Sequence, residues 1–140
     1  MSKIDYKYSH GAILVSDIER SADFYTRAFG WEREFAAQFD ESLGVANGYG
    51  GKGQIIMGRL GGVHLQLVQM QVPLERKVRP AHFGIFMCSV MVPDLTPVLA
   101  NLKAEGIALT REMDIGRSRL LVVTDPDGQE IGIIGPRAPA

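Results

Sequence analysis

The sequence predicts an α+β fold made of two β-α-β-β-β modules in tandem. The chain has 140 residues, 46% of them hydrophobic, which suffices for one core or for two small fused units. Its apolar runs follow the same order twice: a strand, a helix and three strands. The valines that end the two leading strands, Val15 and Val92, are 77 positions apart, and the glycines that end the two helices, Gly30 and Gly106, are 76 apart. A nearly constant offset indicates an internal duplication.

The first module begins with an apolar strand over residues 11–15. A helix follows, with Ser16 or Asp17 as N-cap and Gly30 as terminator. Its buried face is predicted from helical spacing to consist of Ile18, Ala22 and Tyr25. Three β-like runs separated by glycine-rich connections complete the module, over residues 31–39, 54–60 and 63–68.

The second module repeats this order after a strand over residues 85–92. Its helix is predicted to have Thr96 as N-cap, Pro97 in the first turn and Gly106 as terminator. The buried stripe of that helix is predicted to be Val98, Leu99 and Leu102. The last three strands are expected over residues 107–115, 118–125 and 129–135, with a DPDG turn joining the last two.

These patterns place the first module at residues 1–68, a linker rich in proline and charge at 69–82, and the second module at 83–140, all within one domain. The balance of 15 basic and 16 acidic residues offers no field for a nucleic acid or an anionic membrane. The single cysteine, Cys88, cannot form an internal disulfide, and no apolar signal core or membrane-spanning run is visible. We therefore expect a cytoplasmic protein.

The chain resembles a known family in its duplicated modules, in the DPDG turn before its last strand, and in one opening motif. That motif, H-x-x-x-x-V-x-D-x-x-x-S-x-x-F-Y, consists of His10, Val15, Asp17, Ser21, Phe24 and Tyr25. The pattern is similar to the vicinal-oxygen-chelate superfamily, which includes glyoxalase I, methylmalonyl-CoA epimerase, extradiol dioxygenases, fosfomycin-resistance enzymes and bleomycin-binding proteins. The resemblance implies curved mixed sheets around a cavity that takes a small molecule, and a homodimer.

The resemblance also locates the four positions that hold the metal in the metalloenzymes of the family. They fall on His10, Gln66, Met87 and Gly132. Because methionine and glycine replace a histidine and a glutamate, the metal site is predicted to be degenerate and no cofactor is expected. The alternative is a divalent metal held by His10, Gln66 and Glu130. His82 is predicted to be a linker or rim residue.

Strand alternation suggests which side chains take over the chemistry. Glu130 shares a face with Gly132, and His64 shares a face with Gln66. We predict His64 and Glu130 as an acid-base pair, with His10 and Gln66 orienting a carbonyl or hydroxyl group and Gly132 leaving room beside them. The alternative is that His64 and Glu130 are polar groups at the cavity rim and that His10 is inert.

The predicted ligand-binding surface is apolar, which suits a hydrophobic or aromatic ligand. Tyr49, in a glycine-rich loop, is expected to act as a lid, and ordinary core filling is the competing interpretation of the methionines. The complete set is Leu14, Tyr49, Met57, Met87, Ser89, Met91 and Gly132. Cys88 has the opposite parity and is expected beneath a helix rather than as a nucleophile.

Three functions follow, in order of preference. The first is a lyase-like or isomerase-like enzyme that acts on an apolar or aromatic metabolite by protein acid-base chemistry. The second is a ligand-binding protein without catalysis, like the bleomycin-resistance members. The third is a metal-dependent glyoxalase-like or epimerase-like enzyme with a rearranged site.

Overall fold

The computed structural model describes residues 4–42, 51–72 and 87–138. The chain divides into two compact units. The first unit contains residues 1–18 and 31–73, and the second contains residues 19–30 and 74–140. The segment 19–30, which the sequence order assigns to the first module, therefore belongs to the second unit.

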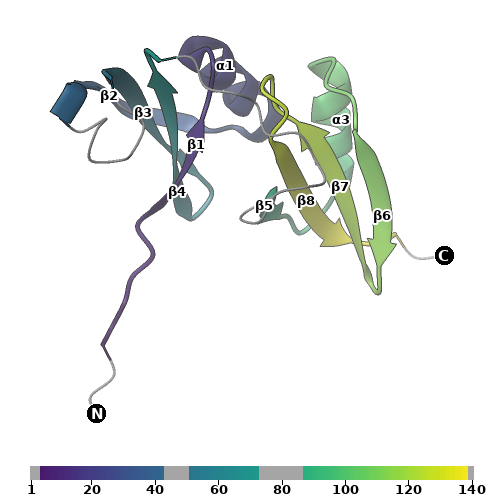
Figure 1. The fold of residues 1–140 in the computed structure, drawn as a ribbon. Coiled ribbons are helices and arrows are strands. Elements are labelled where there is room, and N and C mark those ends of the chain that lie inside the picture. Colours follow the sequence, from purple (N-terminus) through teal and green to yellow (C-terminus); the bar gives the residue numbers. More distant parts are fainter. Residues whose placement is uncertain (1–3, 43–50, 73–86, 139–140) are drawn as a thin grey trace, which may run out of the picture. The chain divides into compact units, whose positions relative to one another are not determined.

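The sheet of the first unit has four strands in the order β1-β4-β3-β2 (Figure 1). Strand β1 (His10–Leu14) runs parallel to β4 (Val63–Met70). Strands β2 (Glu32–Phe39) and β3 (Gly53–Leu60) complete the sheet with antiparallel pairings. Strand β4 extends two residues beyond the predicted end of the first module.

The sheet of the second unit repeats this topology in the order β5-β8-β7-β6. Strand β5 (Met87–Met91) is parallel to β8 (Glu130–Pro136). Strands β6 (Arg111–Ile115) and β7 (Ser118–Thr124) pair antiparallel with their neighbours. The predicted α+β fold with two mixed sheets is confirmed.

Helix α1 (Ile18–Phe29) ends where the sequence predicts, at Gly30, whose φ of 67° is in the left-handed region that favours glycine. Its buried face is also confirmed, because its three predicted members are at most 5% exposed: Ile18, Ala22 and Tyr25.

Helix α3 (Thr96–Ala104) corrects two predictions. Thr96 is not the N-cap, because that position is occupied by Leu95 and has no side-chain cap. The Asp94 carboxylate instead accepts a 2.8 Å hydrogen bond from the Thr96 amide, which lowers the pKa of Asp94. The predicted buried stripe is also too wide, because Leu102 is 2% exposed whereas Leu99 is 40% exposed.

The core of the first unit is built around Trp31, which is 1% exposed. Its indole Nε1–H donates a 3.1 Å hydrogen bond to the carbonyl of Leu65. Its ring lies directly over Gly58, where a Cβ atom would collide with it. Leu67 and Ile56, both at most 2% exposed, complete this core. The core lies on one face of the first sheet and does not extend to the opposite face.

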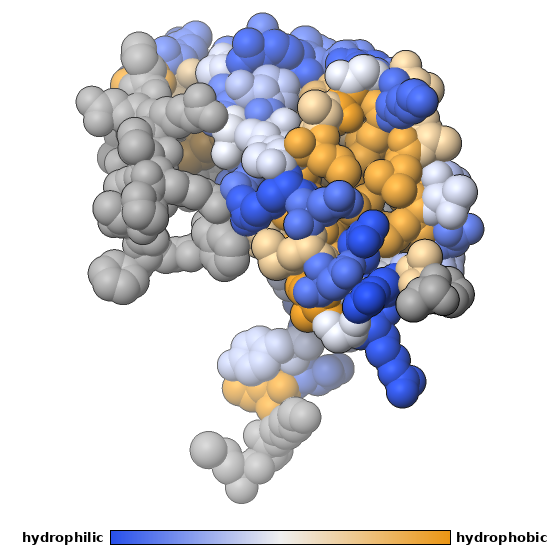
Figure 2. Space-filling view, turned by 90° about the vertical axis from the view of Figure 1, so that its right-hand side faces the viewer, coloured by the Kyte–Doolittle hydropathy of each residue, from blue (hydrophilic) through white to orange (hydrophobic). Residues whose placement is uncertain are grey.

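The core of the second unit lies on the other side of its sheet from Glu130 and Gly132. It contains Leu121, Val123, Ile131 and Ile133, all at most 1% exposed. On the side of the molecule where α3 and β6 lie in Figure 1, Figure 2 shows an apolar area bordered by polar groups. Leu99, Met113 and Ile115 are the large apolar side chains of these two elements that are at least 40% exposed.

Candidate functional site

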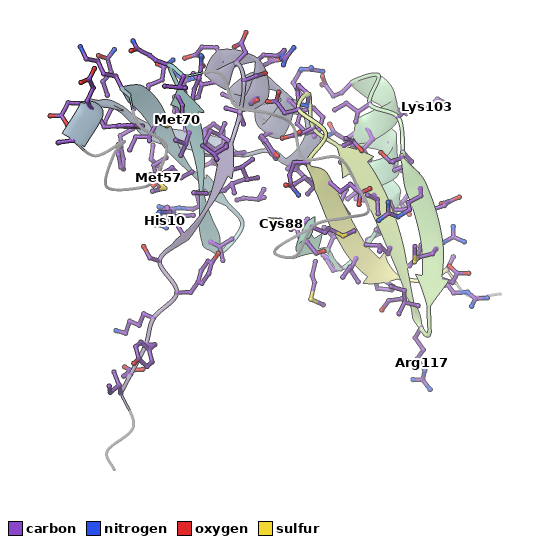
Figure 3. The ribbon with its side chains drawn as sticks, viewed as in Figure 1. His10, Met57, Met70, Cys88, Lys103 and Arg117 are labelled. Carbon is purple, nitrogen blue, oxygen red and sulfur yellow. The ribbon has the colours of Figure 1, made fainter. Side chains whose placement is uncertain are left out.

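Four predicted site residues lie together on the face of the first sheet that does not carry its core. The register of β1 with β4 places His10 beside His64 and Ala12 beside Gln66. The register of β3 with β4 places Met57 opposite Gln66. Register partners project from the same face, so this face, called here the histidine face, carries His10, His64, Gln66 and Met57. Figure 3 labels His10 and Met57 in this sheet.

The partner of His64 is a residue that sequence reasoning missed. Glu34 Oε2 lies 3.0 Å from His64 Nε2. The other oxygen, Oε1, lies 2.6 Å from Nη2 of Arg59, which is the register partner of His64 on β3. One carboxylate therefore connects the imidazole of His64 with the guanidinium of Arg59.

Glu34 lies at an irregularity of β2. The register with β3 shifts between Arg33 and Phe35, so that Glu34 is the extra residue of a β-bulge. Because Glu32 is the register partner of Arg59, simple alternation would also place Glu34 on the face of Arg59 and His64. Sequence reasoning missed this contact because it does not give the register of β2 with its neighbours, and because charges such as Glu32, Arg33 and Glu34 are ordinary for an exposed strand.

His10 is exposed, and its Nδ1 lies 2.9 Å from the hydroxyl of Ser9. Gln66 is half-buried, and Leu14 is 37% exposed. Tyr49 and His82 lie outside the described residues, so their predicted roles as lid and rim residue remain predictions.

The second sheet repeats the registers of the first. Met87 pairs with Glu130 and Ser89 pairs with Gly132, as His10 pairs with His64 and Ala12 with Gln66. The equivalence that the resemblance implied between the two last strands is therefore supported by strand register. We call the face that carries Met87, Ser89, Glu130 and Gly132 the methionine face.

The expectation that Gly132 leaves free space is wrong. A Cβ atom at this position would lie 2.6 Å from Ser89 Oγ and 2.9 Å from both Leu120 Cδ1 and Met87 Sδ. The neighbouring side chains therefore fill the volume into which a glutamate would project. Gly132 allows this close approach rather than opening a cavity.

The residues present do not fit the metal that the family implies. Position 87 offers a thioether, position 132 offers no side chain, and the space above position 132 is filled. Within the described ranges, no group of three or more His, Cys, Asp and Glu side chains could hold a metal ion. Gln66 is a weak donor for a transition metal compared with imidazole or carboxylate.

Glu130 makes a contact that sequence analysis did not anticipate. Its Oε1 and Oε2 accept hydrogen bonds of 2.5 and 2.7 Å from Nη1 and Nη2 of Arg111. Glu130 is 8% exposed, and the Arg111 side chain is 38% exposed. Hydrogen bonding to this carboxylate raises the pKa of Arg111. Arg111 is therefore the outer member of the pair.

Cys88 is half-buried on the opposite face of β5, and burial raises the pKa of its thiol. A thiol with a raised pKa is a poor nucleophile at neutral pH.

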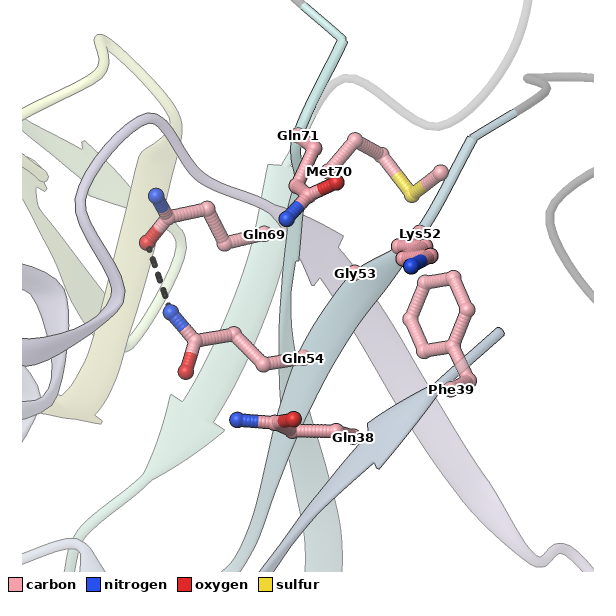
Figure 4. Close-up of a pocket in the computed structure, with 8 residues that line it drawn as sticks. All are labelled: Gln38, Phe39, Lys52, Gly53, Gln54, Gln69, Met70 and Gln71. Carbon is pink, nitrogen blue, oxygen red and sulfur yellow. Dashed lines mark hydrogen bonds between the residues drawn. The ribbon is translucent and has the colours of Figure 1, made fainter. Parts of the chain in front are cut away.

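A small hollow lies at one end of the first sheet, away from the predicted site residues. It has a volume of about 190 Å³ and is lined by Gln38, Phe39, Lys52, Gly53, Gln54, Gln69, Met70 and Gln71 (Figure 4). Gln69 Oε1 accepts hydrogen bonds from the Ile18 amide at 2.8 Å and from Gln54 Nε2 at 3.4 Å. Gln69 therefore satisfies the first amide of α1.

Comparisons with known proteins identify the class. The model of the Glyoxalase/Bleomycin resistance protein/Dioxygenase superfamily matches residues 7–133, so the chain belongs to this superfamily. No match was found among curated proteins. Within the described ranges, no helix is both long and apolar enough to cross a membrane.

Solved structures show the same fold at low sequence identity. A glyoxalase family protein from Bacillus cereus has a TM-score of 0.77 and 20% identity, covering 97% of this chain and 98% of that chain. A glyoxylase/bleomycin resistance protein/dioxygenase domain from Frankia sp. has a TM-score of 0.74 and 18% identity, with coverages of 99% and 96%. The genomically encoded fosfomycin resistance protein of Listeria monocytogenes, complexed with Mn(II) and sulfate, has a TM-score of 0.65 and 12% identity, with 96% of each chain covered.

Proposed function

We propose that this chain is a small-molecule enzyme of the superfamily that works by protein acid-base chemistry on an apolar or aromatic metabolite. The observation that carries the proposal is the contact between His64 Nε2 and Glu34 Oε2 at 3.0 Å. A histidine oriented by a carboxylate is a common general base. Isomerisation, elimination and ring closure all need such a group.

The arrangement gives each nitrogen of His64 a role. With Nε2–H donating to Glu34, Nδ1 carries the lone pair that accepts a proton from the substrate. Glu34 then stabilises the imidazolium, and Arg59 holds the other carboxylate oxygen of Glu34. The side chains of His64 and Glu34 are 43% and 29% exposed, so a substrate can reach them.

The other predicted catalytic residues have supporting roles in this proposal. His10, beside His64, and Gln66, one step further along β4, offer polar groups that orient a carbonyl or hydroxyl of the substrate. Glu130 lies in the second unit, where Arg111 holds its carboxylate. Because the donor set does not fit the Mn(II) bound by the fosfomycin resistance protein, no step through a metal is proposed.

A second candidate function is ligand binding without catalysis. It is favoured by the bidentate contact of Arg111 with Glu130, because a carboxylate neutralised in this way is a poor proton acceptor or donor. A homodimer in the cytoplasm belongs to both proposals, and size-exclusion chromatography with light scattering tests the dimer.

The deciding experiment incubates the protein with a panel of aromatic and apolar metabolites in D₂O and follows deuterium incorporation and product formation by NMR. Acid-base catalysis predicts that His64→Ala lowers kcat by at least about a hundredfold, with KM little changed. Glu34→Gln should lower kcat less. Glu112→Gln, an exposed carboxylate of β6, serves as control. Ligand binding with every compound recovered unchanged and undeuterated would support the second candidate.

A further inference from the structure

Arg111 has one bonding edge in use and another available. A guanidinium is planar and can bind oxyanions through two edges, one formed by Nη1 and Nη2 and the other by Nε and one Nη. Glu130 occupies the first edge with bonds from Nη1 and Nη2. Among the described residues, no group accepts a hydrogen bond from Nε of Arg111.

Glu130 also fixes the direction of that second edge. Two parallel hydrogen bonds hold the plane of a guanidinium where a single bond would let it rotate. The carboxylate that holds it is 8% exposed, whereas the Arg111 side chain is 38% exposed. The buried carboxylate of Glu130 thus holds the guanidinium of Arg111, which is itself partly exposed to solvent.

The surroundings of Arg111 are apolar. Its register partner on β7 is Val122, which in turn pairs with Gly132 on β8. Two residues further along these strands, Met113 pairs with Leu120, which pairs with Ile134. Met113 is 44% exposed. The methionine face therefore combines one oriented cation with the exposed apolar side chain of Met113, while Val122 and Leu120 are buried, at 0% and 7% exposed.

We infer that Arg111 binds an oxyanion of a small ligand of the second unit through its Nε edge, while the apolar body of that ligand lies against Met113. The inference goes beyond the proposed function, because it concerns the second unit alone and describes the bound molecule as an apolar or aromatic acid. A carboxylate and a phosphonate share the chemistry that this edge recognises.

Calorimetric titrations with 2-naphthoate, 2-naphthylphosphonate and the uncharged 2-naphthamide test the inference. The wild type is expected to bind at least one of the two anions about tenfold or more tightly than the amide, as charge-assisted hydrogen bonds to a partly desolvated arginine would give. Whichever anion binds more tightly identifies the oxyanion. Equal binding of anions and amide, or no binding of either anion, would overturn the inference.

Three variants sharpen the test. Arg111→Lys keeps the charge and the pairing with Glu130 but lacks the planar edge, so it should lose most of the preference for the anion. Glu130→Gln should strengthen anion binding, because it leaves the charge of Arg111 uncompensated. Arg119→Lys is the matched control, since Arg119 pairs with Asp114 on the same hairpin but on the opposite face. An Arg111→Lys protein that keeps the wild-type preference would refute the inference.

The outcome is separable from that of the proposed function. Binding is measured without turnover, so anion recognition by Arg111 can stand even where His64→Ala leaves catalysis unchanged. Conversely, loss of turnover in His64→Ala with no anion preference in the wild type would retain the acid-base proposal and reject the acid as ligand.

Discussion

The hydroxyl of Tyr25 donates a 2.8 Å buried hydrogen bond to Oδ2 of Asp125, although the two residues are 100 positions apart in the sequence. Tyr25 is the last residue of the opening motif, and Asp125 is the first residue of the DPDG turn. The other oxygen of Asp125 accepts hydrogen bonds from the amides of Asp127 and Gln129, at 2.9 and 2.8 Å. The two motifs that carry the family resemblance therefore form one structural contact within the second unit.

Removing this hydroxyl should cost stability. Tyr25→Phe leaves a buried carboxylate with one donor fewer, for which a loss of about 1–3 kcal/mol in the free energy of unfolding is expected. Urea denaturation measures it. Tyr6→Phe is the matched control, because Tyr6 is 83% exposed and should change stability little. Equal effects of the two substitutions would show that the hydrogen bond contributes nothing.

Asp125 should also make stability depend on pH. Burial raises its pKa above the ordinary 3.8, and the hydrogen bonds that it accepts only partly oppose this. Because the folded protein then binds this proton more tightly than the unfolded chain, ionisation of Asp125 destabilises the fold above the raised pKa. That destabilisation disappears as the pH falls through the raised pKa toward 3.8.

The comparison variant is Asp125→Asn, which cannot titrate but retains an oxygen for the turn amides. The unfolding free energy of the wild type minus that of the variant should rise between pH 7 and pH 4. Denaturation curves at several pH values give this difference directly, and a difference that is flat or falls toward acid would contradict the assignment.

The sequence predicted those features that depend on short-range periodicity. The spacing of Ile18, Ala22 and Tyr25 identified the buried face of α1, because a helix brings every third or fourth residue to one side. Strand alternation likewise predicted that His64 shares a face with Gln66 and that Glu130 shares a face with Gly132. Each of these is a property of one strand or one helix.

The contacts of the candidate site depend on features that periodicity does not contain. Glu34 contacts His64 from a bulge in β2, across the intervening strand β3. Arg111 reaches Glu130 from β6, across the intervening strand β7, which its long side chain can span. The filling above Gly132 depends on Met87 and Ser89 of β5 together with Leu120 of β7. Register and side-chain length, rather than pattern, decide such contacts.

A substitution at Gly58 tests the packing of Trp31 in the core of the first unit. Gly58→Ala places a methyl group into the Trp31 indole, which is 1% exposed and held by its bond to Leu65. Because the ring has no free space to move into, a loss of about 1–3 kcal/mol or more is expected. Gly62→Ala is the control, since nothing lies within 4 Å of its added methyl group. Urea denaturation that shows the two variants equally stable would contradict the packing described for Trp31.

Addition of a divalent metal should leave the Tm of the protein unchanged. A metal that binds only the folded state raises Tm by mass action, but positions 87 and 132 supply no strong donor and their surroundings are filled. Thermal unfolding of untagged protein is therefore expected to give the same Tm with EDTA and with a tenfold excess of Mn²⁺, Zn²⁺ or Ni²⁺. A rise of several degrees with one of these ions, abolished in His10→Ala, would instead show that the histidine face has recruited a different ligand set, and the metal-dependent alternative would replace the acid-base proposal.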